Sequence, residues 1–113
     1  MATKRGIIIS MDHPWVEEAF RLELDGETDK AIDLIYVNMD NLMLEAKFDE
    51  VSGILNSIDC DGASEDLLVA FACITNTAKK LVGSRDYFIS RIKTSLEKRG
   101  LEADEIEGIM EGL

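Results

Sequence analysis

The residues most able to do covalent or metal chemistry are two cysteines and one histidine. Cys60 and Cys73 lie thirteen positions apart, and His13 precedes the single proline of the chain. A thiolate nucleophile needs a neighbouring base, and a zinc site needs four Cys or His ligands in close pairs. We therefore expect neither a catalytic residue nor a metal ligand among them. Their expected roles are structural: Cys73 as a small core residue, both thiols reduced, and His13 or Asp12 as a helix cap.

Carboxylates are the most numerous reactive groups, with 23 Asp and Glu residues in the chain. Asp33 and Asp40 share one face of a predicted helix and could in principle bind a cation, but solvated faces alone produce such pairs in so acidic a chain. The segment 59–62 fails as a calcium loop, because glycine stands at loop position four and Ala70 at position twelve. No glycine-rich phosphate loop precedes a lysine. The sequence therefore predicts no cofactor and a non-enzymatic protein.

A stripe of aromatic and polar residues is predicted on the helix that follows Ser84. Tyr87, Arg91, Thr94 and Lys98 are spaced by four, three and four residues, which aligns them opposite the core-facing side. An aromatic ring beside two cations can receive an acidic partner or a phosphate. The alternative is an ordinary solvated face on which the tyrosine lies over its neighbours' stems.

Two apolar residues, Val37 and Leu44, fall outside the main apolar arc of their predicted helix and are flanked by Asp33 and Asp40. Such residues indicate either a helix sandwiched between two layers or an exposed contact patch. The first is expected if the preceding helix folds over them. The second has the anatomy of a protein contact site, an apolar centre with a polar rim.

Periodicity and capping signals predict the elements that carry these residues. The expected helices cover residues 14–24, 29–47, 48–58, 65–82, 85–99 and 103–110, and Ser64 and Ser84 are the expected caps of the fourth and fifth. The break at Phe48 is short, so the two helices around it should form an antiparallel hairpin. The stretch from Leu67 to Val82 is apolar almost all round, which predicts a central helix with Phe71 in the core.

The fold class is therefore all-α: five or six short helices in antiparallel hairpins, with a flexible N-terminal arm. Strand signals are almost absent, and Ile7-Ile8-Ile9, the one candidate, has no partner strand in the chain. We expect the arm to cover residues 1–11 and a single helical domain to cover 12–113.

Composition limits the classes of partner. Apolar residues make up 46% of the chain, too many for a disordered protein, and no apolar run reaches the roughly 18 residues of a membrane span. No secretory leader is evident, which predicts a cytoplasmic protein. The net charge is −11, with sixteen acids and three bases in residues 12–66 against two acids and seven bases in 67–99. An acidic chain repels nucleic acid, so we expect neither a nucleic-acid nor a membrane partner.

The order of elements over residues 29–62, two helices joined by a tight turn within 34 residues, resembles a tetratricopeptide unit. If Phe48 is placed at the aromatic position of that repeat's second helix, Ile32 and Leu44 stand where the repeat has small residues. Residues 65–99 repeat the plan without repeating the residues. The resemblance implies a short array of helical hairpins. The stretch 29–100 is also similar to small helical proteins of bacteria and their phages that have no assigned activity.

These observations favour a non-enzymatic protein–protein interaction module. Its partner would be a basic protein or a second copy of the chain, bound through Val37, Leu44, Asp33 and Asp40, with Tyr87, Arg91 and Lys98 as a second candidate surface. The alternative is an acidic inhibitor or nucleic-acid mimic that occupies a basic groove of another protein. The two hypotheses differ in how binding should respond to salt: a mimic's binding should weaken strongly as salt is added.

Overall fold

The computed structural model describes residues 13–111 and 113, and within these residues all regular secondary structure is helical. The predicted all-α class with six helices is confirmed. The elements are α1 (Pro14–Leu24), α2 (Thr28–Leu44), α3 (Phe48–Ser57), α4 (Glu65–Ile74), the 3-10 turn η1 (Thr75–Ala78), α5 (Arg85–Lys98) and α6 (Ala103–Met110). The expected N-terminal arm, including Ile7-Ile8-Ile9, lies outside the described residues.

Helices α1, α2 and α5 end in the same backbone motif. In each, the second residue beyond the cap donates its N–H to the carbonyl three positions from the helix end, as Glu27 does to Leu22 at 2.9 Å. The residue between adopts a left-handed conformation, with φ of 84° at Gly26 and 83° at Gly100. Glycine takes this conformation without steric cost. Ala46 takes the same position after α2, with φ of 57°.

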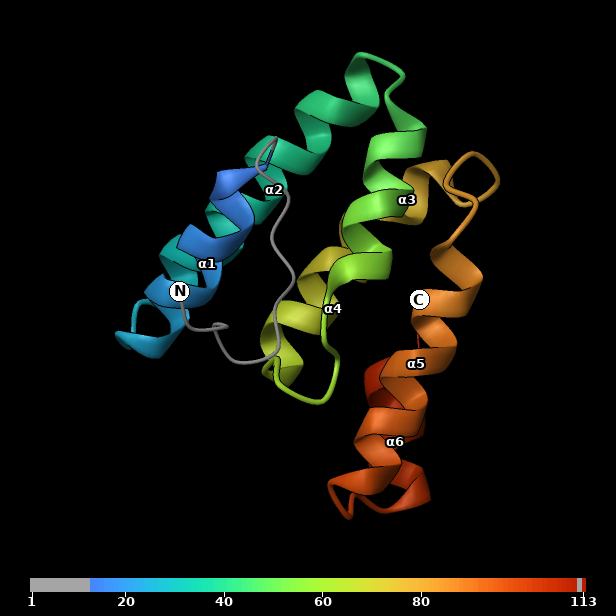
Figure 1. Ribbon diagram of the computed structural model, residues 1–113. Helices are drawn as coiled ribbons and strands as arrows, with labels where there is room; N and C mark the ends of the chain where they lie inside the picture. The colour runs from blue at the N-terminus through green and yellow to red at the C-terminus, as the bar shows by residue number, and fades with distance from the viewer. Residues whose placement is uncertain (1–12, 112) are drawn as a thin grey trace.

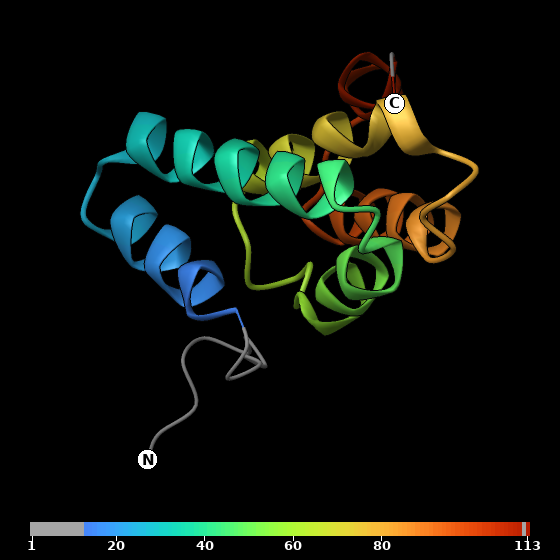
Figure 2. The same cartoon turned by 90° about the horizontal axis from the view of Figure 1, so that it is seen from above.

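The helices pack in two layers (Figure 1). Helices α1 and α3 lie in front of α2 and α4, and Figure 2 shows the two pairs one above the other. Helix α5 contacts both α3 and α4, and α6 packs on α5. The α2–α3 connection is tight, as the sequence predicts, so these two helices form an antiparallel hairpin.

The core is centred on α4, where Phe71 is fully buried as predicted. Its ring stacks against Trp15 at 6.2 Å and Phe20 at 6.4 Å between ring centroids. Both partners come from α1, so the first helix is held to the back layer through aromatic contacts. Ile35 and Met39 of α2 are also fully buried.

The predicted continuous helix over 65–82 is wrong, because α4 ends at Ile74. The Thr75 hydroxyl donates to the Ala72 carbonyl at 2.7 Å, and Arg85 donates to the same oxygen at 3.3 Å. Polar side chains that bond to nearby backbone compete with helical hydrogen bonds, and Thr75 is the first of three such residues in a row. The chain then turns, and Leu81 is left 60% exposed.

Several predicted caps also differ from the structure. Ser64 caps α4 as expected, accepting from the Leu67 N–H at 3.3 Å. Ser84 precedes α5 without capping it; its hydroxyl accepts from Asn56 at 2.9 Å and its N–H donates to Ser52, which ties α3 to α5. His13 stands at the N-cap of α1 but makes no capping hydrogen bond. Among the described residues, no helix has both the length and the apolar character needed to cross a membrane.

We expect Phe71→Ala to lower the free energy of unfolding by about 3–5 kcal/mol, because the change removes a fully buried ring and leaves a cavity. Urea denaturation followed by circular dichroism measures the loss. Leu24→Ala, at a 57% exposed position, is the control and should change stability little. A loss at Phe71 below about 1 kcal/mol would show that α4 does not form the centre of the core.

Candidate functional site

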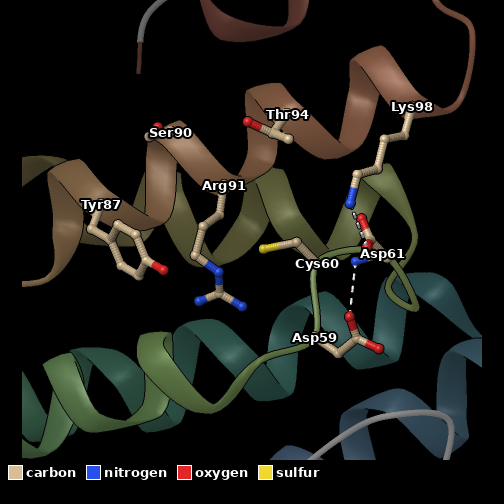
Figure 3. Close-up of a pocket in the computed structure, with 8 residues that line it drawn as sticks. All are labelled: Asp59, Cys60, Asp61, Tyr87, Ser90, Arg91, Thr94 and Lys98. Carbon is tan, nitrogen blue, oxygen red and sulfur yellow. Dashed lines mark hydrogen bonds and ion pairs between the residues drawn. The ribbon is translucent and has the colours of Figure 1, made fainter.

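The predicted stripe on α5 lies beside the loop between α3 and α4, and together they line a groove of about 320 Å³ (Figure 3). Tyr87, Arg91 and Lys98 of the predicted site all belong to its wall. Sequence reasoning missed the opposite wall, because nothing in the spacing of residues 59–61 shows that this loop folds against α5. The lining residues are Asp59, Cys60, Asp61, Tyr87, Ser90, Arg91, Thr94 and Lys98.

Arg91 crosses the groove rather than pointing to solvent. Its guanidinium donates to the Leu55 carbonyl at 3.1 Å and also to the Ile58 carbonyl, at the C-terminal end of α3. These carbonyls lack partners within the helix, and a cation there also interacts favourably with the helix dipole. The Tyr87 ring lies under the same guanidinium, 5.6 Å from its centroid. Arg91 therefore holds α3 against α5.

Lys98 and the loop form a second set of contacts. Lys98 Nζ lies 3.2 Å from Asp61 Oδ2, and the Asp61 N–H donates to the Asp59 carboxylate at 3.1 Å. Hydrogen bonding with Ser95 and Lys98 lowers the pKa of Asp61. Behind them, Ser95 and Arg99 both donate to the Cys60 carbonyl, at 3.0 Å and 2.7 Å. The loop is thus fixed to the C-terminal end of α5 by Ser95, Lys98 and Arg99.

Cys60 is the buried cysteine, and the prediction that Cys73 is the core thiol is wrong: Cys73 is partly exposed. Burial raises the pKa of the Cys60 thiol; Asp59 and Asp61 add to the shift, and Arg91 and Arg99 oppose it. The raised pKa favours the unreactive thiol form. His13 pairs with Glu50 at 3.2 Å near the start of α3, whereas Cys60 follows the end of that helix. The structure therefore brings no histidine to Cys60.

The groove carries two cations and two carboxylates, so its charge is balanced. Both cations already have partners: Arg91 donates to backbone carbonyls, and Lys98 pairs with Asp61. An anion entering the groove would have to compete with these contacts. The geometry therefore gives the α5 stripe a mainly structural role.

Arg91→Ala should lower the free energy of unfolding by about 1–3 kcal/mol, because two part-buried carbonyls lose a charged donor. Urea denaturation measures the change. Lys98→Ala removes only an exposed ion pair and is the matched control on the same helix face; its effect should be much smaller. Equal effects of the two substitutions would contradict the role assigned to Arg91.

The two thiols should react at different rates. Cys60 is 4% exposed, so a thiol reagent such as DTNB should modify Cys73 in the folded protein and reach Cys60 only on unfolding. The Cys73→Ser variant isolates Cys60, and its absorbance trace should be slow without denaturant and fast in urea. Fast reaction of Cys60 in the folded variant would contradict its burial.

The outer face of α2 is the other predicted site, and here the structure decides between the two alternatives for Val37 and Leu44. Both side chains are exposed, to 59% and 76%, so α1 packs on α2 without covering them. Asp33 and Asp40 are exposed on the same stripe of the helix. At spacings of four, three and four residues, the four side chains follow one another along a single line. We call this line the α2 face.

The carboxylates of the α2 face are not neutralised. Asp33 and Asp40 form no ion pair with any residue that the structure describes. The three bases between residues 13 and 66 are already paired with nearby acids in the sequence: Arg21 with Glu18 and Asp25, Lys30 with Glu27 at 2.6 Å, and Lys47 with Glu45 at 3.1 Å. The face therefore combines exposed apolar side chains with uncompensated negative charge.

A second apolar feature borders this face. Tyr36, about 100° around α2 from Val37, lines a groove of about 260 Å³ that α2 shares with α4 and α6. Ile32, Val69 and Ile109 also line it, together with the carboxylates of Glu65 and Asp66. Partial burial raises the pKa of Tyr36, and the nearby Cys73 adds to the shift. Helical spacing places Tyr36 within the apolar arc of α2, which predicts burial, but the residue is 39% exposed.

In the described part of the chain, no three His, Cys, Asp or Glu residues are grouped so that they could hold a metal ion. Comparison with known proteins yields no match: no family model, no curated protein and no solved structure is significantly similar to the chain. Function must therefore be inferred from the residues and their geometry.

Proposed function

We propose that the protein is a non-enzymatic interaction module that binds a protein partner through the α2 face. The observation that carries the proposal is the exposure of Val37 and Leu44 in line with two unpaired carboxylates. Single exposed apolar residues are normal on protein surfaces. Here two of them, two helical turns apart, share one face with charges that would orient a partner.

The chemistry of the face indicates the chemistry of the partner. Burying Val37 and Leu44 would supply the hydrophobic part of the binding energy, and a complementary surface would place Lys or Arg against Asp33 and Asp40. Opposite charges also speed association and exclude acidic proteins. The partner should therefore present apolar side chains flanked by basic ones.

The double variant Val37→Ser/Leu44→Ser tests the face. Both side chains are exposed, so the free energy of unfolding should change by less than about 1 kcal/mol while partner binding is lost. The immobilised full chain, the double variant and the control Leu24→Ser, which changes another exposed leucine, are compared for proteins retained from an extract of the source cells. A protein retained by the wild type and the control but not by the double variant is then purified and titrated against all three by calorimetry.

Binding that weakens by about tenfold or more in the double variant alone supports the proposal. Equal retention by all three chains would contradict it, and so would a large loss of stability in the double variant.

The acidic-mimic alternative gains support from the internal pairing of all three bases in residues 13–66, which leaves carboxylates such as Asp33 and Asp40 without an ion pair to any described residue. A mimic would bind chiefly through charge. Asp33→Asn/Asp40→Asn would then abolish binding while Val37→Ser/Leu44→Ser leaves it unchanged, and binding would weaken steeply with salt.

A further inference from the structure

A basic and apolar corner lies between η1 and α5. Lys79, Lys80 and Leu81 follow one another there, both lysines are exposed, and Leu81 is 60% exposed. Neither lysine forms an ion pair with a residue that the structure describes. We call these three residues the lysine corner.

The corner differs from most of the basic residues around it. Arg85, Arg91 and Arg99 donate to backbone carbonyls, and Lys98 pairs with Asp61. Most of the positive charge in residues 67–99 is thus held within the fold. The corner presents two uncompensated cations next to an exposed leucine, the chemistry inferred above for the partner of the α2 face.

We propose that the α2 face is bound by the lysine corner of a second copy of this chain. The inference rests on the proposed function and names its partner. Val37 and Leu44 are seven residues apart on α2, which separates them by roughly 10 Å along the helix. Asp40 and Asn41 lie between them, and the four residues border a hollow of the kind that accepts one apolar side chain in helix packing, so a leucine can pack there. Lys79 and Lys80 then lie near Asp33 and Asp40, so each charge meets its opposite.

The contact is small and the resulting association weak. One leucine and two lysines cover far less than the roughly 1,600 Å² of a standard stable interface. The net charge of −11 also makes two copies repel each other at a distance. Two copies form a closed dimer with two-fold symmetry if each face binds the other copy's corner; if only one such contact is made per pair, the contact is heterologous and the copies form an open chain.

Charge reversal provides the test. The face variant Asp33→Lys/Asp40→Lys carries lysines on both surfaces, and the corner variant Lys79→Glu/Lys80→Glu carries carboxylates on both. Each variant alone should stay monomeric because like charges meet. In an equimolar mixture every face again meets an opposite corner, so association should return. Sedimentation velocity measures the average mass from micromolar to millimolar protein at physiological salt.

Two controls separate the surfaces from general effects of charge and folding. Lys93→Glu reverses an exposed lysine outside the corner and should associate like the wild type, whereas the matched single change Lys80→Glu should not. Leu81→Ser tests the apolar half of the corner without altering charge and should weaken association by about tenfold. Circular dichroism of every variant verifies its helical fold.

A rise in mass for the wild type, loss in each reversed variant and recovery in the mixture support the proposal. A wild type that is monomeric at every concentration overturns it, as does a mixture that fails to associate while the wild type does. In either case, loss of another captured protein in Val37→Ser/Leu44→Ser would leave the proposed function standing with a different partner.

Discussion

The structure depends on hydrogen bonds from one helix to the carbonyl ends of its neighbours. Three arginines of the α5 region act in this way: Arg85 on Ala72 near the end of α4, Arg91 on Leu55 near the end of α3, and Arg99 on Cys60 in the loop between them. The last carbonyls of a helix have no partners within it, and burying them unpaired is costly. A guanidinium satisfies several at once because it carries five donors in a planar fork. Arg85 is only 3% exposed, so these acceptors, rather than water, stabilise its buried charge.

This use of arginine shapes the electrostatics of the whole surface. The basic segment has seven cations, yet the arginines among them face inward and contribute little to an exposed positive patch. In the acidic half the bases pair with acids close to them in sequence, which leaves carboxylates such as Asp33 and Asp40 uncompensated. The acidic segment therefore keeps exposed negative charge, whereas the basic segment exposes less positive charge than its composition predicts. The few free cations, Lys79 and Lys80 among them, carry correspondingly more of the positive surface potential.

Local signals predicted the helices well, and long-range contacts account for the errors. Periodicity and the Gly26 and Gly100 stops act within one or two turns, so they are readable from the chain itself. The end of α4 at Ile74 was missed because its local signal at Thr75 is weak beside the apolar run of residues 67–82, and because Arg85 donates to Ala72 from thirteen residues away. The position of Arg91 on α5 was predicted, but its acceptors lie more than thirty residues earlier in the chain. The sequence also does not reveal how α1 packs on α2. The exposure of Val37 and Leu44, which depends on that packing, could therefore not be predicted.

The packing of α2 explains how an apolar face can persist on a stable helix. Ala31, Ile35 and Met39 are fully buried and hold one side of α2 among its neighbours. Because this burial secures the helix, Val37 and Leu44 are not needed for the core, and their exposure does not cost the helix its anchoring. Because one side of α2 is buried, its exposed side is held rigid before a partner arrives, so little conformational entropy would be lost on binding. Weak contacts made by few side chains depend on such preorganisation, which supports α2, rather than a loop, as the binding site proposed for this protein.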